Sequence, residues 1–201
     1  MERLSFSQTE LDALKEVGNI SAGNAATAFS QIVGKKINMN VPQVSVFSIQ
    51  ELEQSFKDEE IKIGLYQKIL GQASGSILIV FPKQSAADLI EMVFPNKKGS
   101  GKILEIQDED LLRELANITS GAYFTTLAKM TNFFFMPSVP HLTIDFTHLM
   151  IQHLLKENPG LTRALFILNE LNIEGTKISF QVILLPDLNA LPLILAAIGV
   201  H

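Results

Sequence analysis

Two stretches of the sequence decide the fold: DALKEVGNISAGN at residues 12–24 and DLLRELANITSGA at residues 110–122. Each places two acids, an amide and a glycine in the same order, 98 residues apart, as from Asp12 to Asp110. Nine residues recur at this one offset: Asp12, Leu14, Glu16, Asn19, Ile20, Gly23, Thr27, Val41 and Pro42 match Asp110, Leu112, Glu114, Asn117, Ile118, Gly121, Thr125, Val139 and Pro140. The period exceeds the roughly 20–50 residues of solenoid repeats. It predicts one domain over residues 1–201, built from two related halves of about 1–97 and 98–201.

Each half is predicted to contain a long helix, extended segments, an apolar strand and a shorter helix. In the first half these are residues 8–33, 41–49, 62–70, 75–81 and 85–93. In the second half they are 109–131, 141–151, 164–171, 177–185 and 188–198. Residues 96–101 are expected to link the halves, and 51–60 and 156–160 to form polar loops. Short turns between strands predict an α+β fold with a central, largely antiparallel sheet, two long helices and shorter flanking helices.

The ends and faces of the first long helix are marked in the sequence. Ser7 and Glu10 have the spacing of a capping box, and Gly34 and Asn132 suit the left-handed ends of the two helices. At about 100° per residue, apolar and small residues gather on one face. These are Leu14, Ser21, Ala25, Ala28 and Ile32, with Leu11, Gly18 and Phe29 at the edge. Asp12, Glu16, Asn19 and Gly23 fall on the opposite face, as do Asp110, Glu114, Asn117 and Gly121. We call these two sets the first and second polar files and expect both to face solvent.

A solvated helix face is the ordinary explanation of such a file. Two observations count against it here, because the file recurs at one offset and contains residues that disfavour helices. Asparagine is a poor helix former, and each mid-helix glycine costs about 1 kcal/mol relative to alanine. Gly23 and Gly121 follow the amides by one turn, which leaves room for a partner surface to approach. For Gly18 we expect tight packing on the sheet instead, and for Pro42 and Pro140 a role in setting the entry of the chain into the sheet.

Composition excludes several classes of function. The net charge of −5 and the absence of Lys/Arg runs argue against a nucleic-acid partner. The absence of cysteine excludes disulfides and thiolate chemistry and suits the cytoplasm. The N-terminus lacks a signal-peptide core, and no apolar run is long enough to span a bilayer. We therefore expect a cytoplasmic protein without membrane insertion.

Three of the four histidines, His141, His148 and His153, lie close together in the sequence. The spacing of His148 and His153 suits one face of neither a helix nor a strand, so we expect surface or strand-end residues and no metal site. Asp145 is a single acid in the apolar run LTIDF. We expect it to face outward from a strand, with a partner contact as the alternative.

The doubled pattern Asp-x-x-x-Glu-x-x-Asn, followed after 22 residues by Pro, resembles the signature of the CheC/CheX/FliY phosphatases of bacterial chemotaxis. It occurs as Asp12/Glu16/Asn19/Pro42 and Asp110/Glu114/Asn117/Pro140. Length and the two motifs resemble the stand-alone CheC type, since CheX-like chains carry one motif and FliY-like chains add a flagellar-switch domain. The resemblance implies a pseudo-twofold α/β domain that presents both motif helices on one side.

The resemblance also implies dephosphorylation of a phosphorylated CheY-type receiver domain, and a CheD-type deamidase as a partner. Glu16, Asn19, Glu114 and Asn117 are then the catalytic residues. Independently, an uncharged amide has both a donor and an acceptor, so Asn19 and Asn117 can orient a water behind phosphorus without repelling the phosphoryl oxygens. Glu16 and Glu114 are placed to pair with a receiver lysine, with general-base catalysis as the competing role.

Asp12 and Asp110 are expected to assist docking. The chain is expected to need no cofactor of its own, because the receiver supplies Mg²⁺. An interaction module that binds the phosphorylated receiver or the deamidase with little turnover is the alternative function. A flagellar-switch scaffold is a weaker one.

Overall fold

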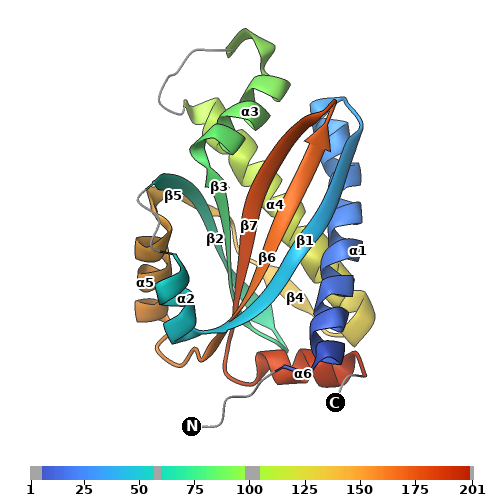
Figure 1. Ribbon diagram of the computed structural model, residues 1–201, viewed down its shortest axis with the longest axis vertical. Helices are drawn as coiled ribbons and strands as arrows, with labels where there is room; N and C mark the ends of the chain where they lie inside the picture. Colours follow the sequence, from blue (N-terminus) through green and yellow to red (C-terminus); the bar gives the residue numbers. More distant parts are fainter. Residues whose placement is uncertain (1–5, 57–59, 98–104, 200–201) are drawn as a thin grey trace.

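The computed structural model describes residues 6–56, 60–97 and 105–199 (Figure 1). The two long helices are α1, Gln8–Val33, and α4, Ile106–Thr131, each of 26 residues. The predicted bounds of α1 are confirmed, and so is the capping box, in which Ser7 Oγ accepts from Glu10 N and Glu10 Oε2 accepts from Ser7 N. Helix α4 begins at Ile106, three residues before the expected start, because Glu105 and Asp108 form a second capping box.

Both long helices end in the left-handed conformation predicted for their last residues. Gly34 has φ 70° and Asn132 has φ 59°, and each backbone N–H closes a hydrogen bond to the carbonyl four residues earlier. The helices therefore begin and end 98 residues apart, at the offset of the sequence repeat.

Seven strands of the described residues form one antiparallel sheet. They are β1 (Ile37–Ser48), β2 (Ile61–Gly71), β3 (Gly75–Pro82), β4 (Phe135–Pro137), β5 (His141–Phe146), β6 (Arg163–Ile173) and β7 (Thr176–Pro186). The order is β1-β6-β7-β3-β2, with β4 and β5 both paired to β2. Strand β1 corresponds to β4 and β5 together, β2 corresponds to β6, and β3 corresponds to β7. Exchanging each strand with its counterpart gives the same order, read from the other edge of the sheet. This is the order of two halves related by a pseudo-twofold axis between β3 and β7.

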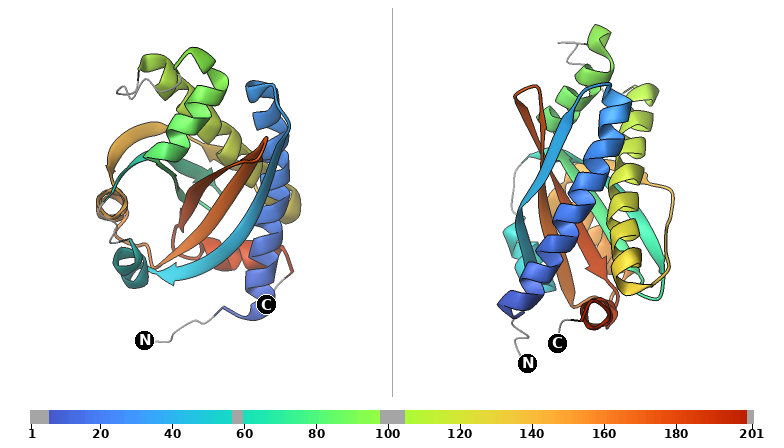
Figure 2. Two further views of the ribbon diagram at one scale, coloured as in Figure 1. Left: turned by 45° about the horizontal axis from the view of Figure 1, so that its top comes forward. Right: turned by 90° about the vertical axis from the view of Figure 1, so that its right-hand side faces the viewer.

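The helices form layers on both faces of this sheet. Helices α1 and α4 lie side by side across one face (Figure 2). The short helices α2, Ile49–Ser55, and α5, Thr147–Glu157, cover the other face and contact each other. Helix α3, Lys83–Val93, followed by the 3₁₀ turn Pro95–Lys97, and helix α6, Ala190–Ala197, lie at opposite ends of the molecule (Figure 1).

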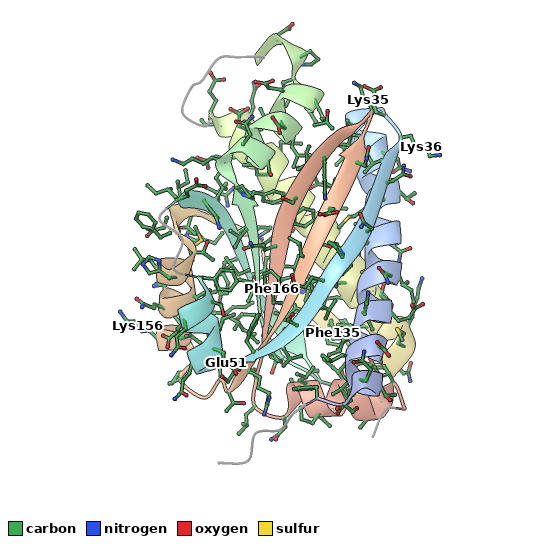
Figure 3. The ribbon with its side chains drawn as sticks, in the orientation of Figure 1. Lys35, Lys36, Glu51, Phe135, Lys156 and Phe166 are labelled. Carbon is green, nitrogen blue, oxygen red and sulfur yellow. The ribbon has the colours of Figure 1, made fainter. Side chains whose placement is uncertain are left out.

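Two apolar cores hold these layers together. The larger one lies between α1, α4 and the sheet and includes the fully buried, stacked rings of Phe81 and Phe180 on the central strands β3 and β7. The smaller one lies beneath α2 and α5 and contains Phe166 (Figure 3). With both faces of the sheet covered, the long helices are left with one free side each, which is the side that carries the polar files.

Several predicted segments differ from the structure. Residues 51–60 are not simply a loop, because a capping box between Ser48 and Glu51 starts α2. The expected strand 141–151 ends at Phe146, and α5 follows and continues to Glu157. The buried residues of α5 recur at helical spacing, as Thr147, Met150, Ile151 and Leu154. Of the expected linker 96–101, residues 96 and 97 end the 3₁₀ turn and the rest lie outside the described residues.

The two motif prolines occupy different positions relative to their strands. Pro42 lies within the edge strand β1, at a shift in its pairing with β6 between Asn40 and Gln43, so it does not mark the entry into the sheet. An edge strand at an irregularity is where the missing N–H of proline is tolerated. Pro140, by contrast, directly precedes β5, as predicted. Its carbonyl accepts a hydrogen bond from Arg113 Nη1 at 2.6 Å.

Candidate functional site on the paired long helices

Both polar files are largely exposed to solvent. Asp12, Glu16, Asn19 and Gly23 are exposed on α1, and Asp110, Glu114 and Asn117 are exposed on α4, with Gly121 half-buried. The opposite face of α1 is buried, including Leu14, Ser21, Ala25 and Phe29. The predicted orientation of the helices is therefore confirmed. In each file, Glu and Asn are separated by three residues, so their side chains lie together on one turn.

The glycines of the two files have open space around them. A Cβ atom added to Gly23 or Gly121 would meet no atom within 4 Å. Gly18 differs, because it is buried and an added Cβ would lie 3.4 Å from Cγ1 of Val41 on β1. Packing on the sheet thus accounts for Gly18, as predicted. The internal packing of the chain does not account for Gly23 or Gly121.

The carboxylates of the files have few partners in the chain. Within the described residues, Glu16 and Glu114 are exposed and make no hydrogen bond or ion pair. Asp12 Oδ1 accepts a hydrogen bond from Gln8 Nε2 at 2.8 Å, and Asp110 is also exposed without a partner. Each helix therefore presents an unpaired negative charge one turn before an amide.

The two files form two separate sites. Helices α1 and α4 run antiparallel (Figure 2), and Asn24 Nδ2 on α1 donates to Thr126 Oγ1 on α4 at 3.4 Å. Asn19 lies five residues before this contact on α1, and Asn117 lies nine residues before it on α4. Because the helices are antiparallel, the two amides lie on opposite sides of the contact and the two offsets add. At 1.5 Å per residue, the two amides are separated by about 21 Å along the helices.

The second amide is bonded to the sheet and the first is not. Asn117 Oδ1 accepts from Nε2 of Gln67 on β2 at 3.3 Å, and the same Nε2 donates to the carbonyl of Ser138 at 2.6 Å. The side chain of Asn19 makes no hydrogen bond within the described residues. The sequence analysis did not identify Gln67. Its only signal was a polar residue at the alternate positions of β2 that otherwise carry Ile63, Leu65 and Ile69, and its contact with α4 depends on strand pairing.

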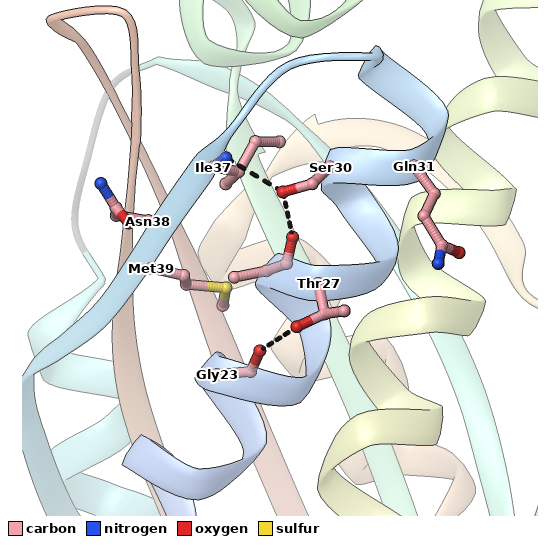
Figure 4. Close-up of a pocket in the computed structure, with 8 residues that line it drawn as sticks. Gly23, Thr27, Ser30, Gln31, Ile37, Asn38 and Met39 are labelled. Carbon is pink, nitrogen blue, oxygen red and sulfur yellow. Dashed lines mark hydrogen bonds between the residues drawn. The ribbon is translucent and has the colours of Figure 1, made fainter.

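The surfaces beside the two helices also differ. A groove of about 590 Å³ lies between α1 and β1 and is lined by Gly23, Thr27, Ser30, Gln31, Asn38 and Met39, among others (Figure 4). Ala26 and Ile37 also line it, and their counterparts in the second half are Phe124 and Phe135. Those two rings stack with centroids 5.5 Å apart. At these two positions the second half therefore has two phenylalanine rings, whereas the first half has the smaller Ala26 and Ile37 beside its groove.

The histidines and Asp145 lie away from both files. His148 and His153 are on α5 rather than at a strand end, and His141 is exposed on β5. Asp145 is half-buried and lines a cavity of about 540 Å³ between β2, β5 and α5, on the opposite face of the sheet. Within the described residues, no three His, Asp or Glu side chains are grouped to hold a metal ion. None of the described helices is both long and apolar enough to cross a membrane.

Both polar files match the sequence profile of a known protein family. The sequence profile of the CheC-like family matches residues 10–46 and again residues 108–144. The two matches begin 98 residues apart, and each contains one whole polar file and its proline. The chain thus carries the sequence pattern of the CheC-like family twice.

Similarity to individual proteins agrees with this match. The chain is 27% identical to the CheY-P phosphatase CheC of Bacillus subtilis over 198 residues, which are 96% of this chain and 95% of that protein. Its fold matches the crystal structure of Thermotoga maritima FliY with a TM-score of 0.77 and 19% identity, over 97% of this chain and 98% of the other. The H. pylori FliM middle domain matches with a TM-score of 0.69 and 11% identity, over 96% and 99%. At these identities, both structures show the fold alone.

Proposed function

We propose that this CheC-like protein hydrolyses the aspartyl phosphate of a CheY-type receiver domain at two sites, Glu16/Asn19 on α1 and Glu114/Asn117 on α4. The observation that carries the proposal is the geometry of the files. Each presents an unpaired carboxylate and a carboxamide on one exposed turn, beside a glycine with open space. The similarity to a CheY-P phosphatase along almost the whole chain supports this choice of substrate.

The chemistry that an amide can supply fits this substrate. Hydrolysis of an acyl phosphate needs a water held in line behind phosphorus, and positioning accounts for much of such a barrier. The Asn19 and Asn117 amides would each hold one water through their donor and acceptor groups, and neither adds charge that repels the phosphoryl oxygens. Mg²⁺ would be held by the receiver, so the chain would need no cofactor of its own.

Glu16 and Glu114 are assigned to docking through an ion pair with a receiver lysine, and Asp12 and Asp110 to supporting it. This assignment predicts a particular effect of charge reversal. Glu16→Lys combined with Glu114→Lys should lower kcat/KM on the phosphorylated receiver by at least about tenfold, because attraction becomes repulsion. Most of the loss should appear in KM, and raising the salt concentration should reduce the difference from wild type.

A matched control comes from charges outside the files. Glu53 lies on α2, is exposed and is outside both files. Reversing its charge should leave KM unchanged. If the file variant loses kcat at unchanged KM, then Glu16 and Glu114 act in the chemical step instead, as general bases.

The whole proposal is tested by the rate of phosphate release from a Mg²⁺-loaded, phosphorylated receiver. Added protein should accelerate release above the receiver's own rate, and absence of acceleration would contradict a phosphatase. A CheD-type deamidase is proposed as a second partner, with Asp145 as a candidate contact. A cytoplasmic location, without nucleic-acid or membrane partners, belongs to the same proposal.

A further inference from the structure

Gln67 is a buried amide beneath the second polar file. It lies on β2 between the core residues Leu65 and Ile69, and 1% of its surface is exposed. Its Nε2 donates to the carbonyl of Ser138 and to Oδ1 of Asn117, at 2.6 Å and 3.3 Å. Its Oε1 is also buried and has no hydrogen-bond partner.

These two bonds determine which way the Asn117 amide points. A backbone carbonyl can only accept, so the Gln67 amide must turn its nitrogen toward Ser138. The second N–H on that nitrogen then faces Asn117, which must offer its oxygen, since two NH₂ groups would repel. The Nδ2 group of Asn117 is thereby directed away from the sheet, and one lone pair of its oxygen stays available to a water.

Stability does not explain a glutamine at this position. Asn117 and Ser138 are both exposed residues, and the bond from Gln67 to the Ser138 carbonyl is only partly buried. Burying an acceptor without a partner opposes folding. A leucine would suit the neighbours of Gln67 and would remove the buried, unpaired Oε1, at the cost of the bond to the Ser138 carbonyl. What the glutamine adds is an oriented Asn117.

The first half lacks this arrangement. Strand pairing places Ile63 opposite Ile144 and Leu165 opposite Val46, so Asn169 on β6 is the counterpart of Gln67. Its side chain is one methylene shorter. Its Oδ1 accepts from Tyr123 OH at 2.9 Å, and its Nδ2 donates to the carbonyl of Ile167 at 3.2 Å. Burial raises the pKa of Tyr123, so this phenol stays protonated as the donor.

We propose that Gln67 is a positioning residue that holds Asn117 in its working orientation before a receiver docks. The second site is thus preorganised, whereas no group of the described residues holds the Asn19 side chain before docking. The inference rests on the proposed phosphatase function and assigns a further residue to one of its two sites.

The test uses Gln67→Leu in two backgrounds. In Asn19→Ala, where only the second site works, kcat should fall about three- to tenfold, the range for loss of one neutral hydrogen bond. KM should stay the same, because Glu114 is untouched. In Asn117→Ala, where only the first site works, Gln67→Leu should change neither constant. Any change in the melting temperature should be small and the same in both backgrounds. Gln67→Asn, which keeps the amide but shortens it, should reproduce the loss of kcat.

A second readout does not depend on activity. The side-chain amide resonance of Asn117, identified by its disappearance in Asn117→Ala, should shift when Gln67 is replaced by Leu. An unchanged resonance, an unchanged kcat in Asn19→Ala, or an equal loss in both backgrounds would overturn the inference. If neither background accelerates phosphate release, the proposed function fails, and the resonance alone then decides whether Gln67 orients Asn117.

Discussion

Replacing both file amides, Asn19→Ala together with Asn117→Ala, is expected to abolish nearly all acceleration of phosphate release. Each side chain is assigned to hold the attacking water, and loss of positioning in a phosphoryl transfer costs on the order of a hundredfold. Because the two amides are separated by about 21 Å along the helices, each single variant should keep the activity of the other site. Initial rates on a phosphorylated, Mg²⁺-loaded receiver give the measurement.

Asn24→Ala is the matched control for these variants. Asn24 is also an exposed asparagine on α1, but it lies outside the file and bonds to Thr126. It should retain wild-type rates. A double variant with full activity would contradict the catalytic assignment. A single variant that loses all activity would show that one half alone is a working site and that the other serves for docking.

Bulky side chains at the file glycines are expected to block docking while the protein stays folded. The double variant Gly23→Phe/Gly121→Phe should lower kcat/KM by at least about tenfold, because a ring beside each amide keeps the receiver surface at a distance. Any loss of stability should be small, since a Cβ at either position meets no atom within 4 Å and glycine disfavours helices by about 1 kcal/mol. Receiver kinetics and thermal unfolding measure the two effects separately.

Gly23→Ala/Gly121→Ala provides the control for size. A methyl group should raise the free energy of unfolding by about 0.4–1 kcal/mol per site and leave most of the activity. Unchanged kinetics in the phenylalanine variant would show that no partner approaches the helices closely at these glycines. The open space would then have no role in docking.

Much of this architecture was predictable because the chain contains its pattern twice. One polar file predicts only a solvated helix face, whereas two files at one offset identify the long helices and their free sides. Helices α2 and α5 were missed for different reasons. The capping box of α2 begins a short, mostly polar segment, and α5 follows a strand without any turn residue between them.

The difference between the two halves was less accessible to sequence reasoning. Gln67 is 50 residues from Asn117 in the chain, and only the pairing of β2 with β4 and β5 brings it beneath α4. The packing of the edge strands against the long helices also differs between the two halves. Val41 is buried against Gly18, but Val139 is 82% exposed, and the counterpart of Gly18 is Ala116. The methyl group of Ala116 occupies space that Gly18 leaves open for a valine.

The fold alone does not choose between an enzyme and an interaction module. Similar folds occur in FliY and in the FliM middle domain, so the choice depends on the residues of the files. An interaction module would have no chemical use for a carboxamide beside an unpaired carboxylate at the same spacing in both halves.

The most direct test of the account is the amount of phosphate released when a phosphorylated receiver is present in large excess over the protein. The account predicts that each molecule of protein releases many equivalents of phosphate, at a rate proportional to protein concentration. Binding that saturates at a fixed stoichiometry, with release no faster than from the receiver alone, would contradict it and favour the interaction module.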